Sequence, residues 1–75
     1  MRYVLNKEAL AHDVRRDIEQ HNSSLRKASL QSGVSKSSLH KVVNQRYVSI
    51  TTFLKVCDWL ARNPQQYFET DYSLD

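Results

Sequence analysis

A single glycine divides the middle of this chain. Gly33 is the only glycine in 75 residues, and apolar residues recur at helical spacing on both sides of it. Glycine can leave a helix through the left-handed conformation without steric cost. Two residues later, Ser35 can accept a hydrogen bond from a free amide in the first turn of another helix. Residues 24–44 are therefore predicted to form two short helices, 25–32 and about 36–43, joined by a tight turn.

A first helix is predicted ahead of this pair. Asn6 is suited to cap it, and Leu10, Val14 and Ile18 follow as a narrow apolar stripe. The helix should be about 15 residues long. Residues 1–5 before it are either an extended arm or a segment that folds back over the core, and the sequence leaves both open.

Two more helices are predicted after the pair. Ser49 caps a fourth helix, and Asn63 with Pro64 begins a short fifth one, where the missing proline amide costs nothing. The fourth helix has a core-facing stripe of Ile50, Phe53, Val56, Cys57 and Leu60. An acidic segment, 69–75, remains as a candidate flexible tail. Because no stretch of useful length alternates like a strand, we expect an all-α, compact five-helix single domain over 1–75.

Length and cysteine content exclude several classes of protein. A chain this short has a thin core, and one cysteine cannot form an internal disulfide. The cysteine and three histidines lack the close paired spacings of zinc sites, so neither a metal nor a cofactor is expected. With no carboxylate pair, Cys–His pairing or glycine-rich phosphate loop, an enzyme is not expected. The unpaired thiol, and the lack of an export signal or apolar span, indicate a cytoplasmic protein without membrane contact.

The charges are distributed unevenly along the chain. Between Gln20 and Cys57 there are six Lys or Arg residues and no Asp or Glu. The segments on either side together carry a net charge of −3, which follows from the overall +3. A basic, acid-free middle segment suits a polyanionic partner such as nucleic acid. A solvated basic surface gives the same pattern, and charge alone does not separate the two.

The stretch from Ser24 to Phe68 resembles the phage repressor and Cro helix-turn-helix family, also called lambda-repressor-like or XRE-type. The family has a small residue four positions before the glycine and apolar residues six and nine positions after it. The matching residues here are Ser29, Gly33-Val34-Ser35, Leu39 and Val42. Residues 49–60 are similar to its fourth helix, and residues 63–68 to its fifth.

The resemblance implies a lambda-repressor-like domain that uses residues 24–44 as a helix-turn-helix. It implies a sequence-specific regulator of transcription that binds double-stranded DNA in the major groove. Such a protein is Cro-like or a small phage immunity repressor, acts by occupying its operator, and works in the bacterial cytoplasm. An antitoxin-type regulator and a protein-interaction module on the same fold are the alternatives.

Three residues depart from the family pattern. Ser29 replaces the usual alanine, and is expected to bond a carbonyl one turn back. Leu25 stands where the family often has a glutamine that reaches a DNA phosphate. Gln45 replaces the glycine after the recognition helix, so a left-handed residue there would be a non-glycine under strain.

In the family register, the helix after the turn presents its exposed side chains to the bases. The predicted base-reading residues are Lys36, Ser37, Ser38, His40 and Lys41. The predicted phosphate contacts are Ser24, Ser35, Asn44 and Arg46. A phosphate contact or a solvated side chain remains the alternative for both lysines. If His40 lies against a phosphate, its protonation would strengthen binding as the pH falls.

Relatives of this kind bind pseudo-palindromic operators as dimers, so a homodimer is expected at least on DNA. The candidate dimer contacts are aromatic residues near the C-terminus: Trp59, Tyr67, Phe68 and Tyr72. The alternative is that they close the small core instead.

Overall fold

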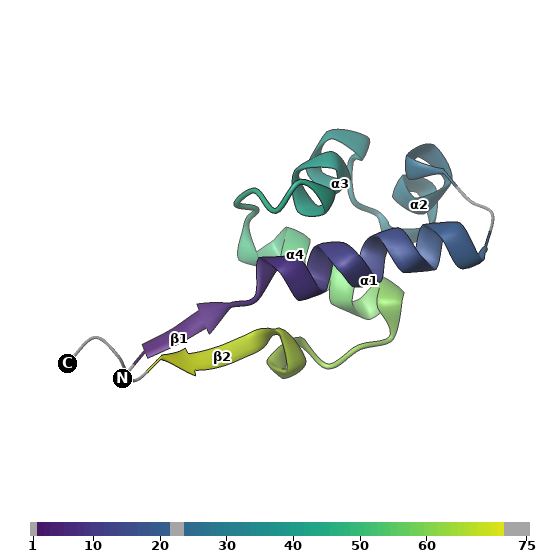
Figure 1. Ribbon diagram of the computed structural model, residues 1–75. Helices are drawn as coiled ribbons and strands as arrows, with labels where there is room; N and C mark the ends of the chain where they lie inside the picture. Colours follow the sequence, from purple (N-terminus) through teal and green to yellow (C-terminus); the bar gives the residue numbers. More distant parts are fainter. Residues whose placement is uncertain (1, 22–23, 72–75) are drawn as a thin grey trace.

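In the part of the chain that the structure describes, four α-helices form the body and a two-stranded sheet projects from it (Figure 1). The computed structural model describes residues 2–21 and 24–71. In chain order the elements are β1 (Arg2–Leu5), α1 (Lys7–Gln20), α2 (Leu25–Ser32), α3 (Lys36–Val43), α4 (Ile50–Leu60), the 3-10 helix η1 (Pro64–Tyr67) and β2 (Phe68–Asp71).

The predicted N-caps are all confirmed. At the start of each helix a side-chain oxygen accepts a hydrogen bond from an amide of the first turn, which satisfies one otherwise unpaired donor. The donor–acceptor distances lie between 2.9 and 3.2 Å. The capping residues are Asn6, Ser24, Ser35, Ser49 and Asn63. Local sequence therefore determines where each helix begins.

In the described part of the chain, left-handed residues follow α2, α3 and α4, namely Gly33, Gln45 and Ala61. Gly33, with φ 74°, ends α2 as predicted, and its amide donates to the Ser29 carbonyl at 3.0 Å. Ala61 has φ 56° after α4, where the amide of Arg62 reaches back to the Cys57 carbonyl at 2.9 Å. This pattern is a Schellman motif built on a residue other than glycine.

The core collects the inward faces of all four helices. Val14, Leu39, Phe53 and Val56 are among the side chains most completely buried, and Leu10 and Ala28 join them. The predicted stripe of α4 is correct at Phe53, Val56 and Cys57, and Leu60 is half-buried. Burial raises the pKa of the Cys57 thiol to about 11. Ile50 is 61% exposed, so its predicted core position is wrong. It begins α4, and the core contacts of that helix begin one turn later.

The sheet corrects the expectation of an all-α five-helix domain. β1 pairs antiparallel with β2, with Leu5 opposite Phe68 and Tyr3 opposite Thr70. The expected fifth helix is a single 3-10 turn, and part of the expected acidic tail, residues 69–71, belongs to β2; residues 72–75 lie outside the described part. Each strand has only four residues, too few for a clear alternation, and their pairing joins distant parts of the chain.

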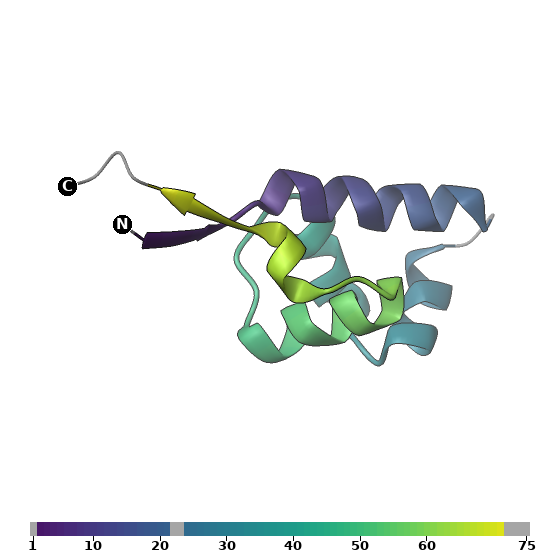
Figure 2. The ribbon, with the colours of Figure 1, turned by 90° about the horizontal axis from the view of Figure 1, so that it is seen from below.

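Residues 2–5 form β1, which combines features of both alternatives for residues 1–5, and Met1 lies outside the described residues. Leu5 packs against the core, as the fold-back alternative expected, whereas Val4 is on the other face of the sheet and is 40% exposed. The ribbon extends beyond the helices at the end opposite α2, as both views show (Figure 2).

Tyr67 fastens this ribbon to the helical body. Its side chain is 2% exposed, and its hydroxyl donates to Asp13 Oδ2 of α1 at 2.7 Å. Its carbonyl accepts from the amide of Asn6 at 2.6 Å, and its ring meets Phe53 edge to face at 6.2 Å. Burial, followed by the hydrogen bond to Asp13, raises the pKa of the Tyr67 phenol well above its usual value.

Replacing Tyr67 by phenylalanine should lower the free energy of unfolding at neutral pH by about 1–2 kcal/mol, because Asp13 loses its donor. The raised pKa adds a pH dependence. Above pH 10 the Tyr67 phenol loses its proton in the unfolded state but keeps it in the folded state. The free energy of unfolding of the wild type therefore falls as the pH rises, whereas that of Tyr67→Phe lacks this contribution. Urea unfolding from pH 7 to 11 should show the difference between the two proteins narrowing above about pH 10. Tyr47→Phe is the control, since Tyr47 is 80% exposed; an equal effect of both changes would contradict this account.

Candidate nucleic-acid interface

The helix α3 has two clearly different sides. Leu39 and Val42 are buried in the core. The opposite side consists of exposed polar and basic side chains, namely Lys36, Ser37, His40 and Lys41. The prediction of a helix with one face on the core and one polar face is confirmed, and four of the five predicted base-reading residues share the exposed face.

These four side chains meet two others around a shallow hollow of about 540 Å³. The additional residues are Leu25, from the first turn of α2, and Arg46, from the loop after α3. We call this site the basic hollow, defined by Leu25, Lys36, Ser37, His40, Lys41 and Arg46. Three of its residues carry a positive charge and none is acidic. α2 and α3 stand side by side on one side of the molecule (Figure 1).

The first turn of α3 is ordered by a group of serine hydroxyls. Ser35 Oγ accepts from the Ser38 amide at 3.2 Å and donates to Ser38 Oγ at 2.9 Å. Ser37 Oγ lies 3.3 Å from the same hydroxyl. Ser38, the fifth predicted base-reading residue, is half-buried and does not line the basic hollow. Ser35, predicted as a phosphate contact, is engaged in this network as the helix cap.

Two backbone hydrogen bonds close the last turn of α3. The amide of Gln45 donates to the Val42 carbonyl at 3.0 Å, and that of Arg46 to the Lys41 carbonyl at 2.8 Å. These two bonds form a Schellman motif with Gln45 left-handed at φ 59°, so the left-handed conformation is kept here by a residue other than glycine. The motif turns the chain back, so that Arg46 lines the basic hollow.

An arginine of α1 also holds this end of α3, and the sequence analysis missed it. The Arg15 guanidinium donates a hydrogen bond to the Val43 carbonyl. A positive charge at the C-terminus of a helix is favourable because the free carbonyls there carry partial negative charge. The only sequence signal was its position beside Val14 in the core stripe, from which a long side chain can reach a neighbouring helix.

His40 and Asn44 are engaged with each other. The side-chain amide of Asn44 donates through Nδ2 to the His40 carbonyl at 2.8 Å, and the same nitrogen lies 3.2 Å from His40 Nδ1. Asn44 thus caps the end of α3, and its phosphate contact stays a prediction. Ser24 caps α2 through the amide of Lys27, and its phosphate contact also stays a prediction.

The Ser29 hydroxyl bonds in the opposite direction from the one expected. It donates to the carbonyl of Val34 at 2.6 Å, across the turn. Val34 follows the end of α2, and the turn at Gly33 brings its carbonyl within reach of the hydroxyl. The serine at this position therefore fastens the turn between α2 and α3 together.

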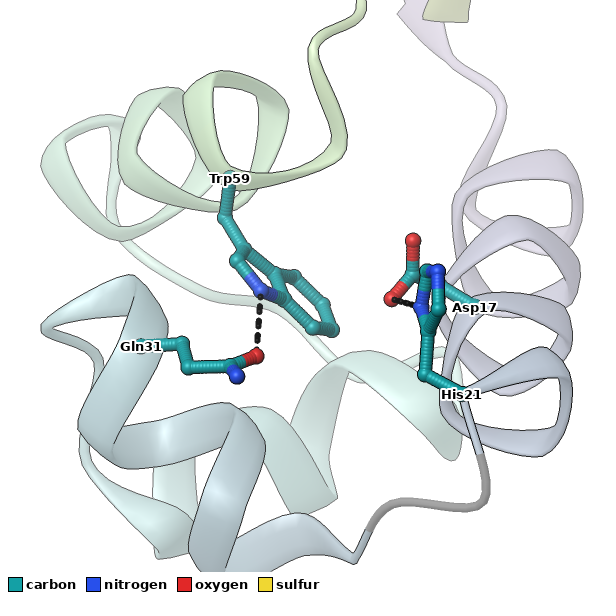
Figure 3. A network of polar contacts seen from close by, with 4 residues as sticks. All are labelled: Asp17, His21, Gln31 and Trp59. Atoms are coloured by element: carbon teal, nitrogen blue, oxygen red, sulfur yellow. Dashed lines mark hydrogen bonds and ion pairs between the residues drawn. The ribbon is translucent and has the colours of Figure 1, made fainter.

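The candidate dimer residues do not form one group. Trp59 is half-buried at the end of α4, and its Nε1 donates to Gln31 Oε1 of α2 at 3.4 Å (Figure 3). The same view shows the indole turned toward the pair of Asp17 and His21, whose side chains lie 3.2 Å apart. Phe68 meets Phe53 edge to face at 5.5 Å and is 38% exposed.

Tyr67 is removed from this set, because its buried side chain closes the core, as the alternative expected. Tyr72 lies outside the described residues.

Within the described part of the chain, 2–21 and 24–71, no group of three or more His, Cys, Asp or Glu side chains is placed to hold a metal ion. No helix there is long and apolar enough to cross a membrane. Comparisons of the chain with protein-family models, curated proteins and solved structures found no match.

The strain at Gln45 is open to a direct test. Gln45→Gly should raise the free energy of unfolding by about 0.5–1 kcal/mol, because glycine adopts the left-handed conformation freely. Asn44→Gly is the matched control and should lower stability, since Asn44 has φ −98° and its side chain bonds the His40 carbonyl. Urea titrations of the three proteins measure both effects. A loss of stability in Gln45→Gly would show that the turn does not strain this residue.

Proposed function

We propose that this protein is a sequence-specific regulator of transcription that binds double-stranded DNA. The observation that carries the proposal is the basic hollow, which lies on the exposed face of α3 and contains three cations and no acid. The two-helix unit of α2 and α3, joined by Gly33, is consistent with the helix-turn-helix of the phage repressor and Cro family. Within that class, we propose a Cro-like protein or small immunity repressor that acts by operator occupancy.

In this proposal α3 lies in the major groove. Lys36, Ser37 and Lys41 then face the base edges, where lysine can donate to the acceptors of guanine. Arg46 and the remaining charge of the middle segment neutralise phosphates and supply affinity that does not depend on sequence. The lysine contacts to guanine are the selective ones here, because serine can bond several different bases. We therefore expect a short, G·C-containing core in each half-site.

Two substitutions in the same hollow should affect DNA binding differently. Lys36→Ala should relax the preference at one base pair by about 1–3 kcal/mol, because it removes a base contact. Arg46→Ala should weaken binding to all sequences alike and lower the salt slope by about one, because it removes a phosphate contact. The measurement is a selection from random duplexes, followed by salt titration of the best sequence with each variant.

Lys55→Ala is the control for this experiment. Lys55 belongs to the same basic segment, but it lies on α4 and does not line the hollow. Its loss should leave the base preference unchanged. A wild-type salt slope near zero, or a selection without an enriched motif, would refute DNA recognition altogether.

We also propose that two copies bind one pseudo-palindromic operator. Helix-turn-helix dimers place their two recognition helices about one helical turn of DNA apart. Ile50 and Leu54 lie one turn apart on α4 and are 61% and 46% exposed, and Phe68 of β2 is 38% exposed. All three side chains are at least 38% exposed, Phe68 even though its ring meets Phe53, which makes them candidates for a contact between copies.

Leu54→Lys should reduce the stoichiometry on a full operator from two to one, or separate the two binding steps, because a charge replaces an apolar contact. Leu30→Lys is the control, since Leu30 is also exposed but lies on α2. Sedimentation of the free protein and of its complex with a full and a half operator gives the stoichiometry. If two copies of Leu54→Lys bind a full operator with the affinity of the wild type, this surface is not the contact between copies.

A further inference from the structure

The basic hollow contains an apolar residue where a DNA-binding surface would be expected to be polar throughout. Leu25 lines the hollow together with the cationic side chains of α3 and Arg46. It is the first residue of α2 and is half-buried, with part of its side chain packed against the core. The part that lines the hollow is therefore held in place by the fold.

The position of Leu25 limits what it can contact in a bound duplex. It follows Ser24, the cap of α2, and it shares the hollow with Lys36 and Lys41. The side chain of a leucine cannot form a hydrogen bond with a phosphate or a base edge. It can only contribute by contact with another apolar group.

The major groove offers one exposed apolar group at the base edges, which is the 5-methyl group of thymine. A 5-methylcytosine presents the same group in the same place. We propose that Leu25, with the adjoining lysine stems, receives the 5-methyl group of one pyrimidine in each half-site. The surrounding cations attract the duplex through its phosphates, and Leu25 adds a preference for the 5-methyl group, which the cations cannot recognise.

This inference rests on the proposed DNA-binding function, and it adds the identity of one base feature that is read. It also gives a reason for leucine at a position where a polar residue would anchor a phosphate. Burial of a single methyl group changes an equilibrium by about fourfold at room temperature. A fourfold preference per half-site is therefore the size of effect to expect.

The test changes only the methyl group. In the best duplex from the selection, each pyrimidine of one half-site is prepared with and without its 5-methyl group, as thymine against uracil or as 5-methylcytosine against cytosine. Base pairing and hydrogen-bonding groups are the same within each pair. One position should bind about fourfold more tightly when the methyl group is present, and the others should change little.

Leu25→Ala should abolish this preference, and Leu30→Ala should retain it. Leu30 is the matched control because it is a leucine of the same helix, is 80% exposed and does not line the hollow. The preference is a ratio measured within each variant, so a general loss of affinity cancels from it. Leu25→Gln, which replaces the apolar end of the side chain with a polar amide, should also abolish the preference and serves if the alanine variant does not fold.

The outcomes separate the two proposals. If the wild type shows no sequence preference and no salt dependence, DNA binding itself fails. If the wild type binds its operator but no 5-methyl group matters, the role of Leu25 is overturned while DNA binding stands. A methyl preference that survives in Leu25→Ala and Leu25→Gln also overturns it. A uniform loss of affinity in both variants, with the preference intact, would assign Leu25 to the sugar-phosphate backbone.

Discussion

The burial of Leu39 and Val42 is the constraint on which the proposed site depends. These two side chains of α3 enter the common core, where they are at most 2% exposed. With them fixed, the rotation of the helix about its axis is fixed, and positions 36, 37, 40 and 41 must face outward. In a domain this small the core is thin, so few other buried side chains can hold α3 in this orientation. The proposed reading face is therefore as stable as the contact between α3 and the rest of the core.

Contacts from outside α3 complete this arrangement at its two ends. Ser29 closes the turn before the helix by bonding Val34, and Arg15 reaches the Val43 carbonyl after it. The Schellman motif at Gln45 then directs Arg46 back toward the same face. Strain at one backbone position is thus linked to the placement of the Arg46 charge at the basic hollow.

How much the sequence revealed depended on whether the interactions were local. All the N-caps and the bounds of α2 and α3 were predictable, because a capping side chain and the amide it bonds are close in sequence. The left-handed conformation of Gln45 was suggested only by the family resemblance, and the residue itself left open whether it would be adopted. The pairing of β1 with β2 and the hydrogen bond from Arg15 to Val43 were not, since they join segments whose proximity only the fold creates. The contact of Leu25 with the basic hollow was not predictable either, because it depends on where α3 lies.

The pairing of the two strands also governs how this chain would respond to mechanical force. Arg2 and Asp71 are partners at the outer end of the antiparallel ribbon. A pull applied between them acts across the strands and loads one pair at a time, starting from that outer end. The helical core carries no load until the inner pair, Leu5 and Phe68, has opened. The ribbon would therefore peel apart at low force, and mechanical strength would reside in the helices behind it.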